Sequence, residues 1–310
     1  MARNLYYLIV DIILVLLQVI VIICNGIIIF VFAREKSLRQ NSSRQLLVVL
    51  TITDFVHAVS TLPYITYLIV SWDPFYLNLS PYFIKIFFIP VIIQLKINLT
   101  LTISIALERT LALYFPVVFR NLSSYPYVKF SLLFGFLLGV VDLALEFSLT
   151  SFRETPNCAS AGCFFNENFS YYWAFSNMVM GTVLIVFMTP FLMKLRALHQ
   201  QPHKSGVVQL RENRFKQANR RSVGTLLISL VFVTLPSVGA GLAKAMGFHV
   251  FDVVGPFYIV GLVSAGACNS VMYLALNKEM QEATNKLITC KRPSFSMTVT
   301  TIKPLSTTRR

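Results

Sequence analysis

Long apolar segments and short polar connectors alternate along the chain. Seven apolar segments follow one another, each about as long as the roughly 17–25 residues that a helix needs to cross a bilayer. They cover residues 8–32, 46–70, 82–107, 130–149, 171–193, 222–246 and 253–276. The connectors are short except for residues 194–221, and we find neither a soluble domain nor an internal repeat. The pattern predicts an all-α membrane protein, a seven-transmembrane helix bundle within residues 1–288.

Composition and charge agree with this class and orient the bundle. Hydrophobic residues make up 55% of the chain and charged residues 13%, against about 45–50% and about 25% in soluble domains. The net charge is +14, but most of the 27 Lys and Arg residues lie on one side of the predicted membrane, and the other side receives only Arg3 and Arg153. We therefore expect a multi-pass protein of the cell membrane with its amino terminus outside and its carboxyl terminus in the cytoplasm. No nucleic-acid partner is expected.

The predicted outer loops carry candidate modification sites. Asn78 and Asn168 each begin an Asn-x-Ser sequon in an outer loop, where glycosylation is chemically accessible. Cys158 and Cys163 lie close together in the same outer loop, so they are candidates for a disulfide, with free thiols as the alternative.

The chain after the seventh predicted span has a different pattern of apolar and polar residues. Residues 277–288 carry scattered apolar positions among polar ones, which predicts a short amphipathic helix at the inner leaflet, and a solvated juxtamembrane segment is the alternative. Cys290 follows as a candidate for palmitoylation. Residues 289–310 form a Ser- and Thr-rich cytoplasmic tail, for which we predict disorder and phosphorylation.

The third apolar segment ends in the acid-base pair Glu108-Arg109. The two charges lie at the boundary between hydrocarbon and water. A charge in this position can be held by the protein in one conformational state and released to a binding partner in another. The alternative is a snorkelling arginine with a nearby counter-ion.

Seven spans with an outer amino terminus and a Glu-Arg pair at the inner end of the third resemble a G-protein-coupled receptor. Asp54 lies in the inner half of the second span, where a carboxylate is costly and usually serves a purpose; satisfaction by neighbouring hydroxyls is the alternative. Asn269 to Tyr273 in the seventh span resembles the Asn-Pro-x-x-Tyr of these receptors, with Ser270 in place of the proline. The resemblance implies that these residues take part in coupling to a heterotrimeric G protein.

More specifically, the chain resembles the nematode serpentine chemoreceptors of class BC. The resemblance rests on Ala112 to Pro116 after the Glu-Arg pair, on Pro156 to Cys163 with Tyr172-Trp173 after it, on Ala218 to Arg220 with Pro236 later, and on Gly255-Pro256. It implies a receptor for small chemical cues, placed in the sensory cilium of a chemosensory neuron and able to work with a partner receptor chain. The chain departs from rhodopsin-like receptors at Ile84, where a loop-anchoring cysteine is expected, and at Thr110 and Thr234.

Charged residues within the spans are the candidate ligand contacts. Lys96 on the third span and Asp142 on the fourth lie at similar depths, and Glu146 is one turn from Asp142. We expect Lys96 to pair with one of these two acids, either as structural support or as the floor of a cavity. The cavity hypothesis adds four candidates to its upper wall, and an anionic, pheromone-like cue would be drawn to the unpaired lysines among them. These four are Lys85, Lys244, Tyr64 and Tyr67.

Two other function classes were weighed. A transporter or channel is the alternative to a receptor, although inverted repeats and broken helices in matching halves are not apparent. An enzyme is not expected, and no cofactor or metal, because His57 has no visible partner, His199 and His203 are cytosolic, and His249 lies in an outer loop. The basic connector 194–221 suits either a G protein or anionic membrane lipids.

Overall fold

The computed structural model describes residues 2–34, 45–117, 124–152, 154–156, 158, 160–199, 221–248, 257–276, 280–282 and 284. Within them, seven helices are long and apolar enough to cross a membrane, which confirms the predicted fold class. They are α1 (Ala2–Arg34), α3 (Gln45–Val70), α4 (Pro81–Tyr114), α6 (Ser124–Leu149), α7 (Glu167–His199), the sixth span (Arg221–Ala245), whose last part is α9 (Leu235–Ala245), and α11 (Phe257–Leu276).

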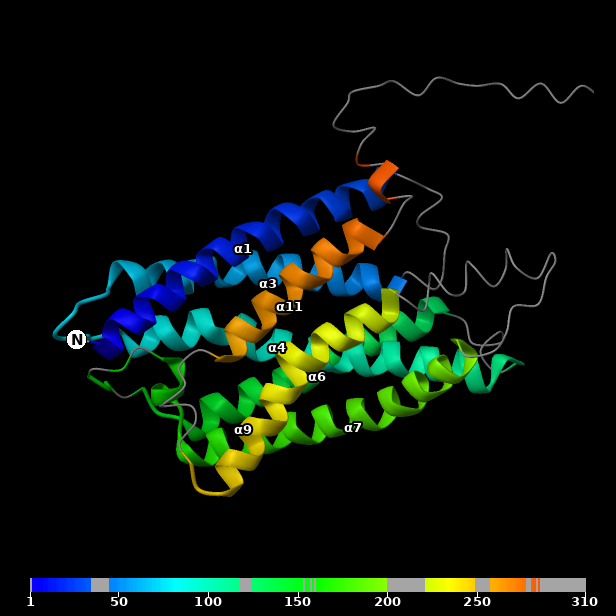
Figure 1. The fold of residues 1–310 in the computed structure, drawn as a ribbon. Coiled ribbons are helices and arrows are strands. Elements are labelled where there is room, and N and C mark those ends of the chain that lie inside the picture. The colour runs from blue at the N-terminus through cyan, green and yellow to red at the C-terminus, as the bar shows by residue number, and fades with distance from the viewer. Residues whose placement is uncertain are drawn as a thin grey trace, which may run out of the picture.

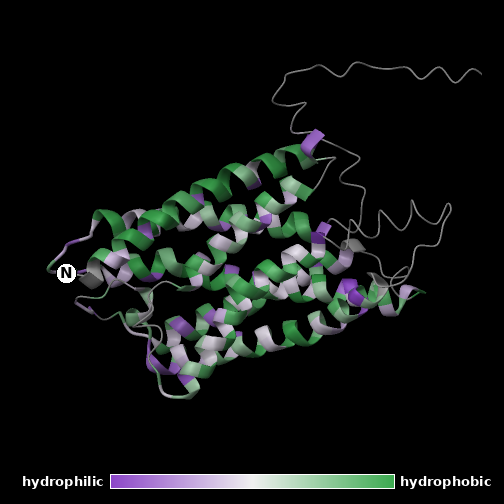
Figure 2. Ribbon diagram, viewed as in Figure 1, coloured by the Kyte–Doolittle hydropathy of each residue, from purple (hydrophilic) through white to green (hydrophobic). Residues whose placement is uncertain are grey.

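The helices form one elongated bundle with α4 at its centre (Figure 1). α4 packs against α3, α6, α7 and α11, and a larger share of it is buried than of any other described span. α1 lies against α3 and α11, and α9 lies against α7. Green, apolar residues run along the helices in Figure 2, while purple residues gather near their ends. An apolar exterior of this kind suits a lipid environment.

The helices extend beyond the apolar segments that predicted them. α4 continues to Tyr114, about two turns beyond its apolar segment. α7 runs from Glu167 to His199, about one turn longer than its apolar segment at the start and about two turns longer at the end. Hydropathy detects only the part of a helix that meets hydrocarbon, so polar turns at the ends escape it.

Three polar residues lie on the buried face of α1. Asp11, Gln18 and Asn25 are seven residues apart, a spacing that keeps them on one helix face, and each is at most 4% exposed. Gln18 Nε2 donates to Thr61 Oγ1 of α3 at 2.9 Å. The face therefore turns inward, since polar groups facing lipid would be left without partners.

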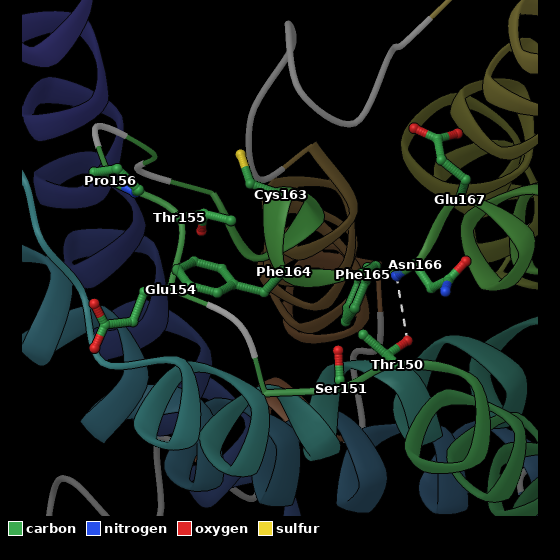
Figure 3. A pocket seen from close by; sticks show the side chains of 10 residues that line it. All are labelled: Thr150, Ser151, Glu154, Thr155, Pro156, Cys163, Phe164, Phe165, Asn166 and Glu167. Carbon is green, nitrogen blue, oxygen red and sulfur yellow. Dashed lines mark hydrogen bonds between the residues drawn. The ribbon is translucent and has the colours of Figure 1, made fainter.

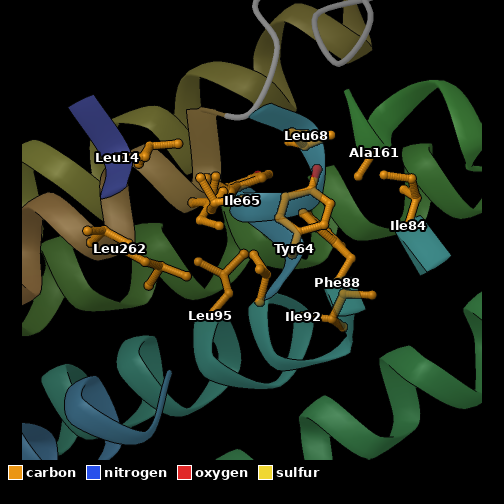
Figure 4. Packing of buried hydrophobic residues seen from close by; sticks show 14 of the residues in the cluster. Leu14, Tyr64, Ile65, Leu68, Ile84, Phe88, Ile92, Leu95, Ala161 and Leu262 are labelled. Atoms are coloured by element: carbon orange, nitrogen blue, oxygen red, sulfur yellow. The ribbon is translucent and has the colours of Figure 1, made fainter. Parts of the chain in front are cut away.

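The amino-terminal end of the bundle, where α1 begins, is closed by a buried cluster and two connectors. Tyr64 is fully buried there and packs edge-to-face on Phe88, with Ile84 and Ala161 beside it (Figure 4). In the connector between α3 and α4, Asp73 Oδ1 accepts backbone hydrogen bonds from Phe75 and Tyr76, which lowers the pKa of that carboxyl.

The sixth span contains a π-helical turn, η3 (Leu230–Thr234), directly before Pro236. Proline has no N–H, so the Phe232 carbonyl four residues earlier loses its helical donor. That carbonyl faces Gly261 of α11 so closely that a Cβ at this glycine would overlap it. The π-turn thus brings the sixth and seventh spans together at backbone level.

The predicted carboxyl-terminal elements are described only in part. Met280, Gln281, Glu282 and Thr284 are helical, and Met280 is fully buried in the core at the end of the bundle opposite the amino terminus. The rest of the amphipathic segment 277–288, Cys290 and the tail lie outside the described residues, so these assignments stay predictions, as does the boundary of the receptor domain at residue 288.

Candidate functional site

The connector between α6 and α7 surrounds a pocket at the amino-terminal end of the bundle (Figure 3). Its volume is about 600 Å³, within the roughly 300–1,000 Å³ typical of small-molecule sites. Its lining combines hydroxyls, two carboxylates and two phenyl rings, and it consists of Thr150, Ser151, Glu154, Thr155, Pro156, Cys163, Phe164, Phe165, Asn166 and Glu167.

A disulfide shapes this connector. Cys158 and Cys163 are bonded to each other, and the 3-10 turn η2 (Ala161–Phe164) lies within and just after the resulting ring. Ser160 Oγ accepts from the Gly162 N–H at the start of the turn. Phe165 then packs against Phe88 of α4, with ring centroids 5.6 Å apart. The connector therefore forms a wall of the pocket and a plug over the bundle.

Lys85 supports the pocket from below. Its Nζ lies 3.2 Å from Glu146 Oε1 and donates to the carbonyl oxygens of Thr150 and Ser151 at the end of α6. The ammonium also lies 4.7 Å from the centre of the Phe152 ring. A cation at a helix carboxyl terminus complements the helix dipole, so Lys85 anchors the end of α6 to α4.

Lys96 forms the second ion pair between α4 and α6. Its Nζ lies 3.3 Å from Asp142 Oδ2 and donates to Ser176 Oγ at 2.8 Å. The Tyr172 hydroxyl donates to the other Asp142 oxygen at 3.1 Å. Lys96 and Asp142 are each 1% exposed, so this network joins α4, α6 and α7 deep in the bundle.

Lys244 and the two tyrosines differ from the expected cavity wall. Lys244 Nζ lies 2.7 Å from Glu167 Oε2, so it is paired. Tyr64 is fully buried in the core, and the Tyr67 ring packs at a tilt against Phe83 while its hydroxyl accepts the Ser80 N–H.

The prediction of unpaired lysines for an anionic cue is therefore wrong. Lys85, Lys96 and Lys244 each have an acidic partner, because the connector and the helix ends bring carboxylates to them. None of the seven residues chosen from the sequence lines the described pocket. The pocket acids Glu154 and Glu167 were missed. Their signal in the sequence was weak, since both lie outside the apolar segments from which the spans were predicted.

The opposite end of the bundle holds the Glu-Arg pair. Arg109 and Glu108 are both about 5% exposed, and their charged groups are 4.0 Å apart. The next turns of α4 are tied to α7, because Thr110 Oγ1 donates to the Phe187 carbonyl at 3.1 Å and the Tyr114 hydroxyl to the Pro190 carbonyl at 3.3 Å.

The remaining coupling candidates lie inside the bundle. Gln94 Nε2 donates to Asp54 Oδ1 at 2.9 Å, and Gly266 of α11 brings its backbone close to the same carboxylate. Asn269 and Tyr273 are buried on α11, and the Tyr273 ring lies 6.1 Å from that of Phe32. Gln94 is a partner that sequence inspection missed.

Both predicted glycosylation sites lie within the described residues. Asn78 and Asn168 are exposed at the amino-terminal end of the bundle, and their glycosylation stays a prediction. Among the residues that the structure describes, no group of three or more His, Cys, Asp or Glu could hold a metal ion.

Comparison with known proteins identifies a family for this chain. The sequence model of the family described as "Serpentine type 7TM GPCR chemoreceptor Srbc" matches residues 3–279. No curated protein matches the chain.

Proposed function

Because the chain belongs to the Srbc family of serpentine seven-transmembrane chemoreceptors, we propose that it binds a small extracellular cue and signals through a heterotrimeric G protein. The family is a receptor family and not an enzyme family, and the seven apolar helices agree with a multi-pass membrane protein. The cue, the G protein and the orientation in the membrane are the parts that we propose.

The buried pair Glu108-Arg109 is the observation that best supports coupling. Two charges about 5% exposed at one end of the bundle are costly unless they are held together or taken up by a partner. The Lys and Arg residues concentrate in connectors at the same end, so the positive-inside rule places it in the cytoplasm. A G protein that competes for Arg109 would meet it there. Asp54, Asn269 and Tyr273 are proposed to support this switch from within.

The pocket at the other end supports cue binding. It lies at the end that the same rule places outside, and its loop wall is held by a disulfide and by aromatic packing on α4. The charge pairs do not favour the anionic cue that the sequence suggested, since Lys85, Lys96 and Lys244 are all paired.

Substitution of Arg109 by Ala tests the coupling. Expressed with a promiscuous Gα subunit and screened with small secreted metabolites for a calcium signal, the native chain should respond, and Arg109→Ala should lose about tenfold or more in potency or all response. Surface expression should persist, because the pair sits at one end of the bundle. Lys129→Ala, an exposed lysine near the same end, is the matched control. Loss of the variant from the cell surface would instead indicate a structural role for Arg109.

Two other parts of the proposal rest on the family alone, a sensory-cilium location and a partner receptor chain. The positive charge of the connector 194–221 supports anionic lipid as its second contact. A transporter or channel is the competing class. A current or uptake that appears on expression without any G protein would favour that class.

A further inference from the structure

We propose that the pocket between α6 and α7 selects a protonated amine, and that the bound ammonium competes with Lys244 for Glu167 and so removes the ion pair that ties the last turn of α9 to the first turn of α7. The inference rests on the proposed receptor function for its signalling consequence, but amine binding itself requires no G protein.

The lining gives the pocket its chemical preference. Its charged members are the carboxylates of Glu154 and Glu167, which lie on opposite sides of the pocket in Figure 3. Phe164 and Phe165 stand between them and offer apolar surface and ring faces, both of which favour an organic cation. Thr155 contributes a buried hydroxyl oxygen that has no hydrogen-bond partner among the described residues, so a donor such as an ammonium would satisfy it.

The nearby lysines do not reverse this preference. Lys85 reaches the carbonyl oxygens of Thr150 and Ser151 under the pocket, but its side chain is fully buried and its charge is balanced by Glu146. Lys244 is not part of the lining and meets Glu167 from α9. Glu154 is exposed, and no ion pair involves it within the described part of the chain. Within the described part of the chain, a ligand in the pocket therefore meets carboxylates before it meets a lysine ammonium.

The bond between Glu167 and Lys244 connects binding to helix position. Glu167 begins α7 and Lys244 stands in the last turn of α9, and their charged atoms are 2.7 Å apart. Glu167 has a 66% exposed side chain while that of Lys244 is only 9% exposed, so an incoming cation can approach the acid from the pocket side. When the ligand ammonium replaces that of Lys244, the Glu167 carboxylate stays neutralised and Lys244 is solvated by water instead. The ion pair between the fifth and sixth spans is then lost.

Three small molecules that share a phenyl ring but differ in charge test the preference of the pocket for an amine. Purified full-length receptor in lipid nanodiscs would be titrated with 2-phenylethylammonium, 2-phenylethanol and phenylacetate while its thermal unfolding is followed. We expect the amine to raise the unfolding midpoint at concentrations where the alcohol and the acid do not. Glu167→Gln should weaken amine binding by about tenfold, the loss of one charge-assisted contact, and Glu154→Gln, which removes the charge on the other side of the pocket, should weaken it less. Glu282→Gln, an exposed glutamate at the opposite end, should leave amine binding unchanged.

Several results would overturn the amine site. The first is that phenylacetate binds as tightly as the amine or more tightly. The second is that the Glu154→Gln/Glu167→Gln double variant binds the amine as the native chain does. The third is that no amine binding is detected up to about 10 mM, a concentration above which binding would be too weak to be specific. Both glutamates are exposed, so the variants should fold, and their unfolding midpoints without ligand verify this.

Lys244→Gln tests the competition separately. Removal of the competing cation should tighten amine binding about threefold to tenfold and raise ligand-independent activation of the G protein. Unchanged amine affinity would overturn the competition. Tighter binding with silent signalling would leave the amine site in place and count against the proposed G-protein function instead.

Discussion

At the scale of single residues, the ion pair between Lys96 and Asp142 has the clearest energetic consequence. Both side chains are 1% exposed, so Lys96→Met would leave the Asp142 carboxylate buried without the cation that neutralises it. We expect Lys96→Met to destabilise the receptor by about 3–5 kcal/mol, and Lys96→Met/Asp142→Leu to recover most of this loss, since no uncompensated charge remains.

Thermal unfolding of the purified receptor measures this difference. Lys129→Met, an exposed lysine on α6, is the control and should change stability by less than about 0.5 kcal/mol. A double variant as unstable as Lys96→Met would show that the pair contributes something other than mutual neutralisation.

Only some of the ion pairs could be predicted from the sequence. Depth counting put Lys96 level with the acids of the fourth span, and the structure pairs it with Asp142. It gave no partner for Lys85 or Lys244. Lys85 pairs with Glu146 and also donates to two backbone carbonyls at the end of α6, and Lys244 meets an acid at the first turn of α7. Backbone acceptors and acids outside the apolar segments leave no signal in a count of charged residues within those segments.

At the scale of the elements, close contact between α4 and α6 depends on two glycines. A Cβ at Gly139 would lie 2.9 Å from the Ile93 Cα, and one at Gly135 would lie 3.0 Å from the Ile97 Cα. Both neighbours are backbone atoms and cannot rotate away. Glycines four residues apart allow helix backbones to approach in a membrane, and this approach places Lys85 and Lys96 within reach of their acids.

Gly139→Ala should therefore destabilise the bundle by about 1–3 kcal/mol, the usual cost of overpacking. Gly239→Ala is the matched control, since nothing lies within 4 Å of a Cβ at that helical glycine. The control should be neutral or stabilising by up to about 1 kcal/mol, because alanine favours a helix over glycine. Unfolding midpoints of the two variants in the same nanodiscs decide the matter, and equal effects would contradict the packing argument.

At the scale of the whole molecule, the seven-helix bundle could be predicted because each span must satisfy its own backbone in lipid, which makes every helix a local signal. The pocket could not be predicted in this way. Its walls come from a connector whose course depends on a disulfide, on η2 and on Phe165 packing against α4. These contacts join residues that are distant in sequence and carry no periodicity.

Orientation in the membrane follows from charge counting, and the sequons offer a direct test of it. Asn78 and Asn168 are exposed at the amino-terminal end of the bundle, whereas the sequons at Asn41 and Asn121 fall in connectors on the basic side. Glycosylation occurs only on the lumenal side, so glycosidase treatment should shift the mobility of the native chain. Asn78→Gln/Asn168→Gln should remove the shift, and Asn41→Gln/Asn121→Gln should leave it intact. The reverse pattern would place Arg109 outside the cell, where no G protein could reach it, and the proposed coupling would fail with the orientation.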